Sequence, residues 1–151
     1  MRLLLQRVSE ARVEVDGEIT GQVEKGLLLL AGFAKGDTQA DIDTLVKKTI
    51  HMRIFENEQG KFDRSVLDIG GGMLVVSQFT LYADTRKGRR PSFHLAMPPA
   101  EAEEMYERLL EAFRVAGVAR VEGGRFGANM QVFLCNDGPV TILLESPTEA
   151  T

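Results

Sequence analysis

The centre of the predicted architecture is MLVVSQFTL, residues 73–81. Its first four residues form a continuous apolar run, which is typical of a strand covered on both faces. Because side chains alternate along a strand, we expect Ser77 and Phe79 on one face and Gln78 and Thr80 on the other. A polar group placed late in a buried strand is held rigidly, so the end of this segment is a candidate site.

Alternating or apolar segments elsewhere predict further strands. Residues 3–8 and 11–15 lead into Asp16-Gly17, a pair that favours a hairpin turn, and residues 18–23 return. Four consecutive leucines between glycines predict a central strand over 26–33, buried on both faces. We also expect a short edge strand at 53–55, an extended piece at 66–69, and strands at 118–122, 130–136 and 140–145. Cys135 lies inside one of them and is predicted to be a small buried hydrophobe.

Two segments show helical spacing. The first begins at Asp37 or Thr38, either of which can cap it, and ends at His51. The second begins at Pro98-Pro99 and is closed by Gly117. The expected buried stripes are Ile42, Leu45, Val46, Thr49 and Ile50 in the first helix, and Ala102, Met105, Tyr106, Leu109, Leu110 and Phe113 in the second.

These elements define an α+β fold, a mostly antiparallel, barrel-like sheet with two main helices packed on it. The chain of 151 residues forms a single domain, 1–151, with residues 146–151 as a frayed tail.

The net charge of −4 argues against a protein that coats nucleic acid by bulk charge. One dense cationic patch stands out, formed by Arg86, Lys87, Arg89 and Arg90, and it suits docking of a polyanion. A single cysteine favours a reducing compartment, and no apolar run is long enough for a membrane helix. We therefore expect a soluble cytoplasmic protein with no membrane contact.

The residue types limit the chemistry. One cysteine and two separated histidines give no metal-ligand spacing, so we expect neither metal nor cofactor. A hydrolytic triad of Ser77 or Thr80 with His94 and Asp84 is formally possible, but no Gly-x-Ser-x-Gly motif supports it.

Four motifs in one chain carry a family resemblance. They are SQFTL at 77–81, RRPSF at 89–93, GRFGANM at 124–130 and NDGPVT at 136–141. Together they resemble the bacterial and eukaryotic D-aminoacyl-tRNA deacylase family, over a span from Gln6 to about Leu144.

The resemblance implies an editing enzyme that hydrolyses the ester between a D-amino acid and the 3′-terminal adenosine of tRNA, and spares L-aminoacyl-tRNA. It implies a metal-free homodimer with two sites at the subunit interface. The Gly138–Pro139 bond would be cis, and this motif of one subunit would reach into the pocket of the other. Its carbonyls would face the substrate α-amino group, so an L side chain would collide while glycine would be accepted.

The resemblance also assigns roles to individual residues. Ser77, Gln78, Phe79 and Thr80 would line the ester, Phe126 and Met130 the pocket for the terminal adenosine, and Arg7 would brace the Gly-Pro motif. The family's chemistry is attributed to the tRNA 2′-hydroxyl, which agrees with the absence of an evident base beside Thr80. From their charge, Arg86, Lys87, Arg89 and Arg90 would contact tRNA phosphates.

Two other functions are compatible with these features. A non-catalytic RNA-binding module would use the basic loop 86–90 without hydrolysing an ester. A purely structural dimer would depend on neither the loop nor the polar strand.

Overall fold

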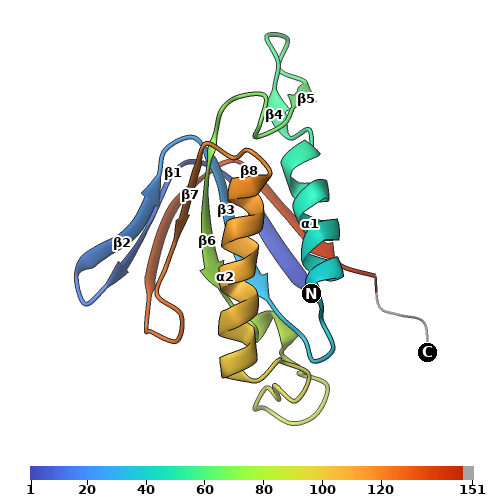
Figure 1. Cartoon of the computed structure of the whole chain (residues 1–151). Helices are drawn as coiled ribbons and strands as arrows, with labels where there is room; N and C mark the ends of the chain where they lie inside the picture. Colours follow the sequence, from blue (N-terminus) through green and yellow to red (C-terminus); the bar gives the residue numbers. More distant parts are fainter. Residues whose placement is uncertain (148–151) are drawn as a thin grey trace.

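The computed structural model describes residues 1–147. Within them the chain forms eight strands, two α-helices and one 3₁₀ helix, η1 (Figure 1). In chain order these are β1 (Arg2–Val15), β2 (Glu18–Val23), β3 (Gly26–Gly32), α1 (Gln39–His51), β4 (Phe55–Glu56), β5 (Phe62–Arg64), β6 (Gly72–Ser77), η1 (Phe79–Tyr82), α2 (Pro99–Val115), β7 (Arg120–Gly123) and β8 (Gln131–Glu145).

The main sheet is organised around β1. One edge of β1 pairs antiparallel with β3 and then with β2, and its other edge pairs antiparallel with β8. Strands β3, β6 and β7 continue the sheet in parallel. The sheet curls until β7 approaches β2, where a Cβ on Gly21 would lie 2.4 Å from the Gly123 carbonyl oxygen. This nearly closed sheet confirms the barrel-like core predicted from the sequence.

The helices α1 and α2 lie side by side on the outside of the sheet (Figure 1). Alternate residues of the central strands pack in opposite directions. Leu27 and Leu29 belong to the core beneath the helices, whereas Leu28 belongs to a second core on the other face. The central strand is therefore buried on both faces, as predicted.

Both helices match their sequence signals. The backbone N–H of Thr38, the N-cap of α1, donates a hydrogen bond of 2.8 Å to the Asp41 carboxylate. All residues of the two predicted stripes are buried, which confirms that these faces cover the sheet. Neither helix in residues 1–147 is long and apolar enough to cross a membrane.

Several local predictions were wrong. Residues 66–69 form a turn rather than an extended piece, since the N–H of Ile69 donates to the Ser65 carbonyl oxygen at 3.2 Å. The edge strand expected at 53–55 is the hairpin β4–β5, which begins at Phe55. The two strands expected at 130–136 and 140–145 form one irregular strand, β8. Cys135 is exposed within the single chain, not buried.

Ser146 does not belong to a frayed tail, contrary to the prediction. Ser146 is buried, and its N–H donates a hydrogen bond of 2.9 Å to the Met1 carbonyl oxygen. Residues 148–151 of the predicted tail lie outside the described residues.

Candidate functional site

The strand that carries the SQFTL motif ends at Ser77, earlier than predicted. The N–H of Gln78 makes a last bond of 2.7 Å to the Ala31 carbonyl oxygen, and the chain then turns into η1. The expected alternation of Phe79 and Thr80 across two strand faces is therefore wrong. Instead, the Gln78 side-chain amide donates a hydrogen bond to the Thr80 hydroxyl.

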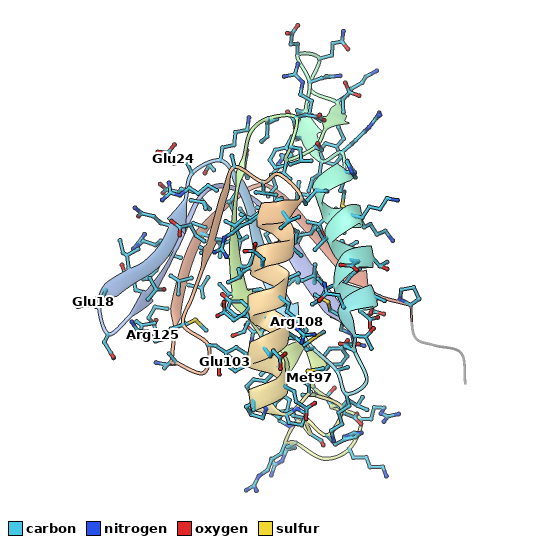
Figure 2. All side chains as sticks on the ribbon, viewed as in Figure 1. Glu18, Glu24, Met97, Glu103, Arg108 and Arg125 are labelled. Carbon is cyan, nitrogen blue, oxygen red and sulfur yellow. The ribbon has the colours of Figure 1, made fainter. Side chains whose placement is uncertain are left out.

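A cavity of about 480 Å³ lies beside this turn. Because β3 and β6 are parallel, their carboxyl ends meet at one edge of the sheet, and the start of α2 closes the same corner (Figure 1). Figure 2 shows Met97, which lines the cavity, beside the first turn of α2. The volume is in the range of small-molecule sites, roughly 300–1,000 Å³. Aromatic rings supply much of the wall, from Phe33, Phe79, Phe93 and Phe126.

The cavity contains four of the residues predicted to form the site, namely Ser77, Gln78, Phe79 and Phe126. The rings of Phe79 and Phe93 meet edge to face, with centroids 5.0 Å apart. Thr80 is exposed and Met130 packs against the second core, and neither lines the cavity. The turn thus gathers the motif of 77–79 with a ring from the loop after β7, about fifty residues away in sequence.

The Gly138–Pro139 segment is exposed and held by a buried arginine. The Gly138–Pro139 peptide bond is cis. The Arg7 guanidinium donates to the Asp137 carbonyl oxygen at 2.8 Å and to the Ile54 carbonyl oxygen at 2.9 Å. With a further ion pair of 3.7 Å to Glu56, Arg7 joins this segment to β4.

The Gly138–Pro139 segment and the cavity lie at opposite ends of the sheet. Arg7 pairs with Leu27, near the beginning of β3, whereas the cavity includes Ala31, near its end. The segment therefore does not line the cavity of its own chain.

The basic loop is closed at its base and contains one internal ion pair. Asp84 and Ser92 exchange two backbone hydrogen bonds of 2.7 and 2.9 Å. Arg86 makes two bonds to the Asp84 carboxylate, of 2.9 and 2.7 Å, and these hold the pKa of Asp84 well below its usual range. Lys87, Arg89 and Arg90 are exposed and make no ion pair within residues 1–147. These three are the cations of the loop that are available to an external anion.

The structure does not assemble the hydrolytic triad considered from the sequence. The His94 ring is 3.0 Å from the Ser92 hydroxyl, and Asp84 is bonded to Arg86. Within residues 1–147, neither residue bonds to Ser77 or Thr80. In the same part of the chain, no three His, Cys, Asp or Glu side chains gather as a metal-ion site.

Tyr106 connects the helix stripe to the site. Its predicted packing role is confirmed, because its side chain is buried in the core. Its hydroxyl also donates to the Val75 carbonyl oxygen at 2.7 Å and accepts from the Gly124 N–H at 3.2 Å. Its ring lies 6.0 Å from that of Phe126, between centroids. Burial raises the pKa of Tyr106 to about 12, so the phenol stays neutral and keeps its hydrogen bonds to both Val75 and Gly124.

Several cavity residues lie outside the four motifs and were not predicted to belong to the site. Phe33 and Lys35 follow the central strand, and Met97 precedes α2. No sequence pattern marks the first pair, because its position depends on the parallel pairing of β3 with β6. A segment that follows a strand parallel to β6 must reach the same edge of the sheet.

Comparisons with known proteins agree with this geometry. The model of the family described as D-Tyr-tRNA(Tyr) deacylase matches residues 4–145. A protein of Thermomicrobium roseum named D-aminoacyl-tRNA deacylase is 58% identical over 97% of this chain and 94% of its own length. A relative of the same name from Acaryochloris marina is 52% identical over 99% of both chains.

Solved structures share the fold. One titled c-Myc DNA Unwinding Element Binding Protein superposes with a TM-score of 0.93 at 44% identity, over 98% of this chain and 100% of its own. One titled as a probable eukaryotic D-amino acid tRNA deacylase gives 0.82 at 18% identity, over 95% and 97%, and is evidence of the fold alone.

Fold and cavity together define a single-domain α+β protein with an aromatic-walled cavity at the end of two parallel strands. The family model matches nearly the whole chain. The chain belongs to the D-Tyr-tRNA(Tyr) deacylase family, which confirms the resemblance found in its motifs and the expectation of a hydrolase.

Proposed function

We infer that the protein hydrolyses the ester of D-aminoacyl-tRNA, releasing the D-amino acid and tRNA. Family membership supports this reaction. The cavity that residues of the SQFTL motif form with Phe126 supports its assignment to specific residues. Aromatic walls suit a nucleobase, because every base has a face that stacks on them. The terminal adenosine would occupy this cavity, with its ester beside Ser77, Gln78 and Phe79.

The catalytic group is best supplied by the substrate. Thr80 Oγ1 accepts a hydrogen bond from Gln78, and no basic side chain in residues 1–147 bonds to it. A threonine without a base is a weak nucleophile, so the 2′-hydroxyl of the terminal adenosine is the better candidate. The first N–H groups of a helical turn have no partner inside the turn, and those of Phe79 and Thr80 would stabilise the developing oxyanion.

Selectivity against L-amino acids requires a second copy of the chain. The Gly138–Pro139 segment lies at the far end of the sheet from its own cavity, so we assign it to the cavity of a partner. Earlier on the same strand, Val132, Phe133 and Leu134 are exposed apolar side chains, as an interface requires. Carbonyls of that segment would bind the α-amino group and exclude an L side chain, whereas a glycyl ester would be accepted.

Docking of the tRNA would use the basic loop. Lys87, Arg89 and Arg90 are free to contact phosphates, in the cytoplasm where aminoacyl-tRNA is used. Arg86 is bonded to Asp84, so its expected role as a phosphate ligand changes to support of the loop.

The test is hydrolysis of D-tyrosyl-, L-tyrosyl- and glycyl-tRNA by the purified protein with a chelator present. We expect release of D-tyrosine and glycine but not L-tyrosine. A D-tyrosyl-tRNA lacking the 2′-hydroxyl of the terminal adenosine should be hydrolysed far more slowly. Equal release of D- and L-tyrosine would remove the role given to Gly138 and Pro139. Binding of tRNA with no hydrolysis would instead support the RNA-binding module.

A further inference from the structure

Lys35 is the one charged residue among the described residues that line the site cavity. The rest of the lining is aromatic, aliphatic or neutral polar. Because Lys35 is exposed, its ammonium group can reach an anionic ligand at the mouth of the cavity.

The backbone of Lys35 is fixed at the mouth of the cavity. Its N–H donates to the Leu95 carbonyl oxygen at 3.1 Å, and the N–H of Met97 donates to the Phe33 carbonyl oxygen at 3.0 Å. Gly36 follows with φ of +90°, a conformation that favours glycine and ends the segment in a tight turn.

No carboxylate in residues 1–147 neutralises Lys35. The acid two residues away, Asp37, is bonded to the Met1 ammonium at 2.8 Å and to the Ala34 N–H at 2.6 Å. Lys35 also borders a neighbouring cavity of about 460 Å³, whose charged lining residues are Arg2, Asp37, Asp41 and Glu145, and none of these carboxylates forms an ion pair with Lys35. Lys35 therefore lies on the rim between two cavities, and its charge is available to an anionic ligand.

We propose that Lys35 binds the phosphate on the 5′ side of the terminal adenosine and thereby sets how deeply the nucleoside enters the cavity. The inference rests on the proposed function. An aminoacyl ester has no carboxylate, and its α-amino group would be repelled by an ammonium. The nearest anion on a terminal adenosine is this phosphate, which leaves the cavity at its rim as the chain continues. Lys35 is a positioning residue that holds the ester beside Ser77.

The experiment compares three substrates: D-tyrosyl-tRNA, 3′-O-D-tyrosyl-adenosine and the 5′-monophosphate of that ester. Lys35→Gln should lower kcat/KM by roughly 10- to 100-fold on the two phosphate-bearing substrates, the effect of one charge-assisted hydrogen bond. On the phosphate-free ester the change should stay below about twofold. Because the phosphate does not react, the loss should be in KM. Lys35→Arg should restore most of the activity, and Lys48→Gln, on the exposed face of α1, should match wild type.

The wild-type enzyme gives a test that needs no variant, since it should hydrolyse the monophosphate ester better than the adenosine ester at low salt. Equal rates on the two esters would overturn the assignment. So would an equal loss on all three substrates in Lys35→Gln, which would place the charge at the ester instead, or no loss on any. If wild type hydrolysed none of the substrates, the proposed function would fail and this assignment with it.

Discussion

Replacing Arg7 with lysine tests whether this buried guanidinium braces the Gly138–Pro139 segment. Arg7 is 6% exposed and makes bonds of 2.8 and 2.9 Å to two carbonyl oxygens, of Asp137 and Ile54. A lysine keeps the charge but not the planar fork, so it can reach at most one of these oxygens. One lost charge-assisted bond and one buried carbonyl without a partner should together lower the free energy of unfolding by ~2–4 kcal/mol.

The assay for stability is urea denaturation at several protein concentrations, because the proposed dimer would unfold in a concentration-dependent way. The matched control is Arg53→Lys. Arg53 is 72% exposed, and its ion pair of 3.7 Å with Asp63 should change stability by less than ~0.5 kcal/mol.

The assay for function is the ratio of D-tyrosyl- to L-tyrosyl-tRNA hydrolysis. If ~1.4 kcal/mol of the lost stabilisation would otherwise serve to exclude the L substrate at Gly138–Pro139, the ratio should fall about tenfold. Wild-type stability in Arg7→Lys would refute the energetic argument. Lower stability with an unchanged ratio would separate Arg7 from selectivity.

Three further predictions concern Tyr106, the basic loop and β8. Tyr106→Phe removes one buried and one part-buried hydrogen bond to the backbone and should lower the free energy of unfolding by ~1–3 kcal/mol, whereas Tyr82→Phe, which removes no hydrogen bond found in residues 1–147, should cost less. Because burial raises the pKa of Tyr106 to about 12, its neutral form stabilises the fold fully below pH ~10, and that contribution is lost as pH rises toward 12. Urea titrations across that range should show a weaker alkaline loss in Tyr106→Phe, and an identical pH profile would contradict this. In filter-binding assays, Arg89→Gln should weaken tRNA affinity and reduce the salt slope by about one, whereas Arg86→Gln should disturb the loop without reducing the slope. Leu134→Asp should give a monomer in sedimentation velocity and lose hydrolysis, and a fully active dimer would falsify the proposed interface.

The helices and the central strands could be predicted because their signals are local. Thr38 caps α1, Pro99 begins α2, and the buried residues of both recur at helical spacing. Three of the four leucines of β3 are buried, on alternating sides, and Leu30 is half-buried, which a continuous apolar run also indicates.

The end of the central strand could not be read from its pattern. Alternating polar and apolar residues continue past Ser77, but the chain leaves the sheet after the bond from Gln78 to Ala31. That bond depends on where β3 ends, which no pattern within 73–81 records.

The predictions of surface properties failed for another reason. Cys135 was predicted to be buried because its neighbours are apolar, yet it is exposed in the single chain, since an apolar pattern alone does not distinguish a core strand face from an exposed one. Likewise, the charge of Arg86 marks a basic loop but not its pairing with Asp84. Lys35 has no motif around it, and its place in the cavity follows only from the parallel pairing of β3 and β6.

The pairing of β1 with β8 has a consequence during synthesis. Residues of β1 from Arg2 to Glu14 pair with β8 from Glu145 back to Gln131, so one edge of β1 waits for nearly the whole chain to be made. Until then a nascent chain presents an open row of backbone donors and acceptors, to which another nascent chain could add. Pairing of such distant segments also slows folding. Ribosome-associated chaperones should therefore matter most for this protein before its last strand emerges.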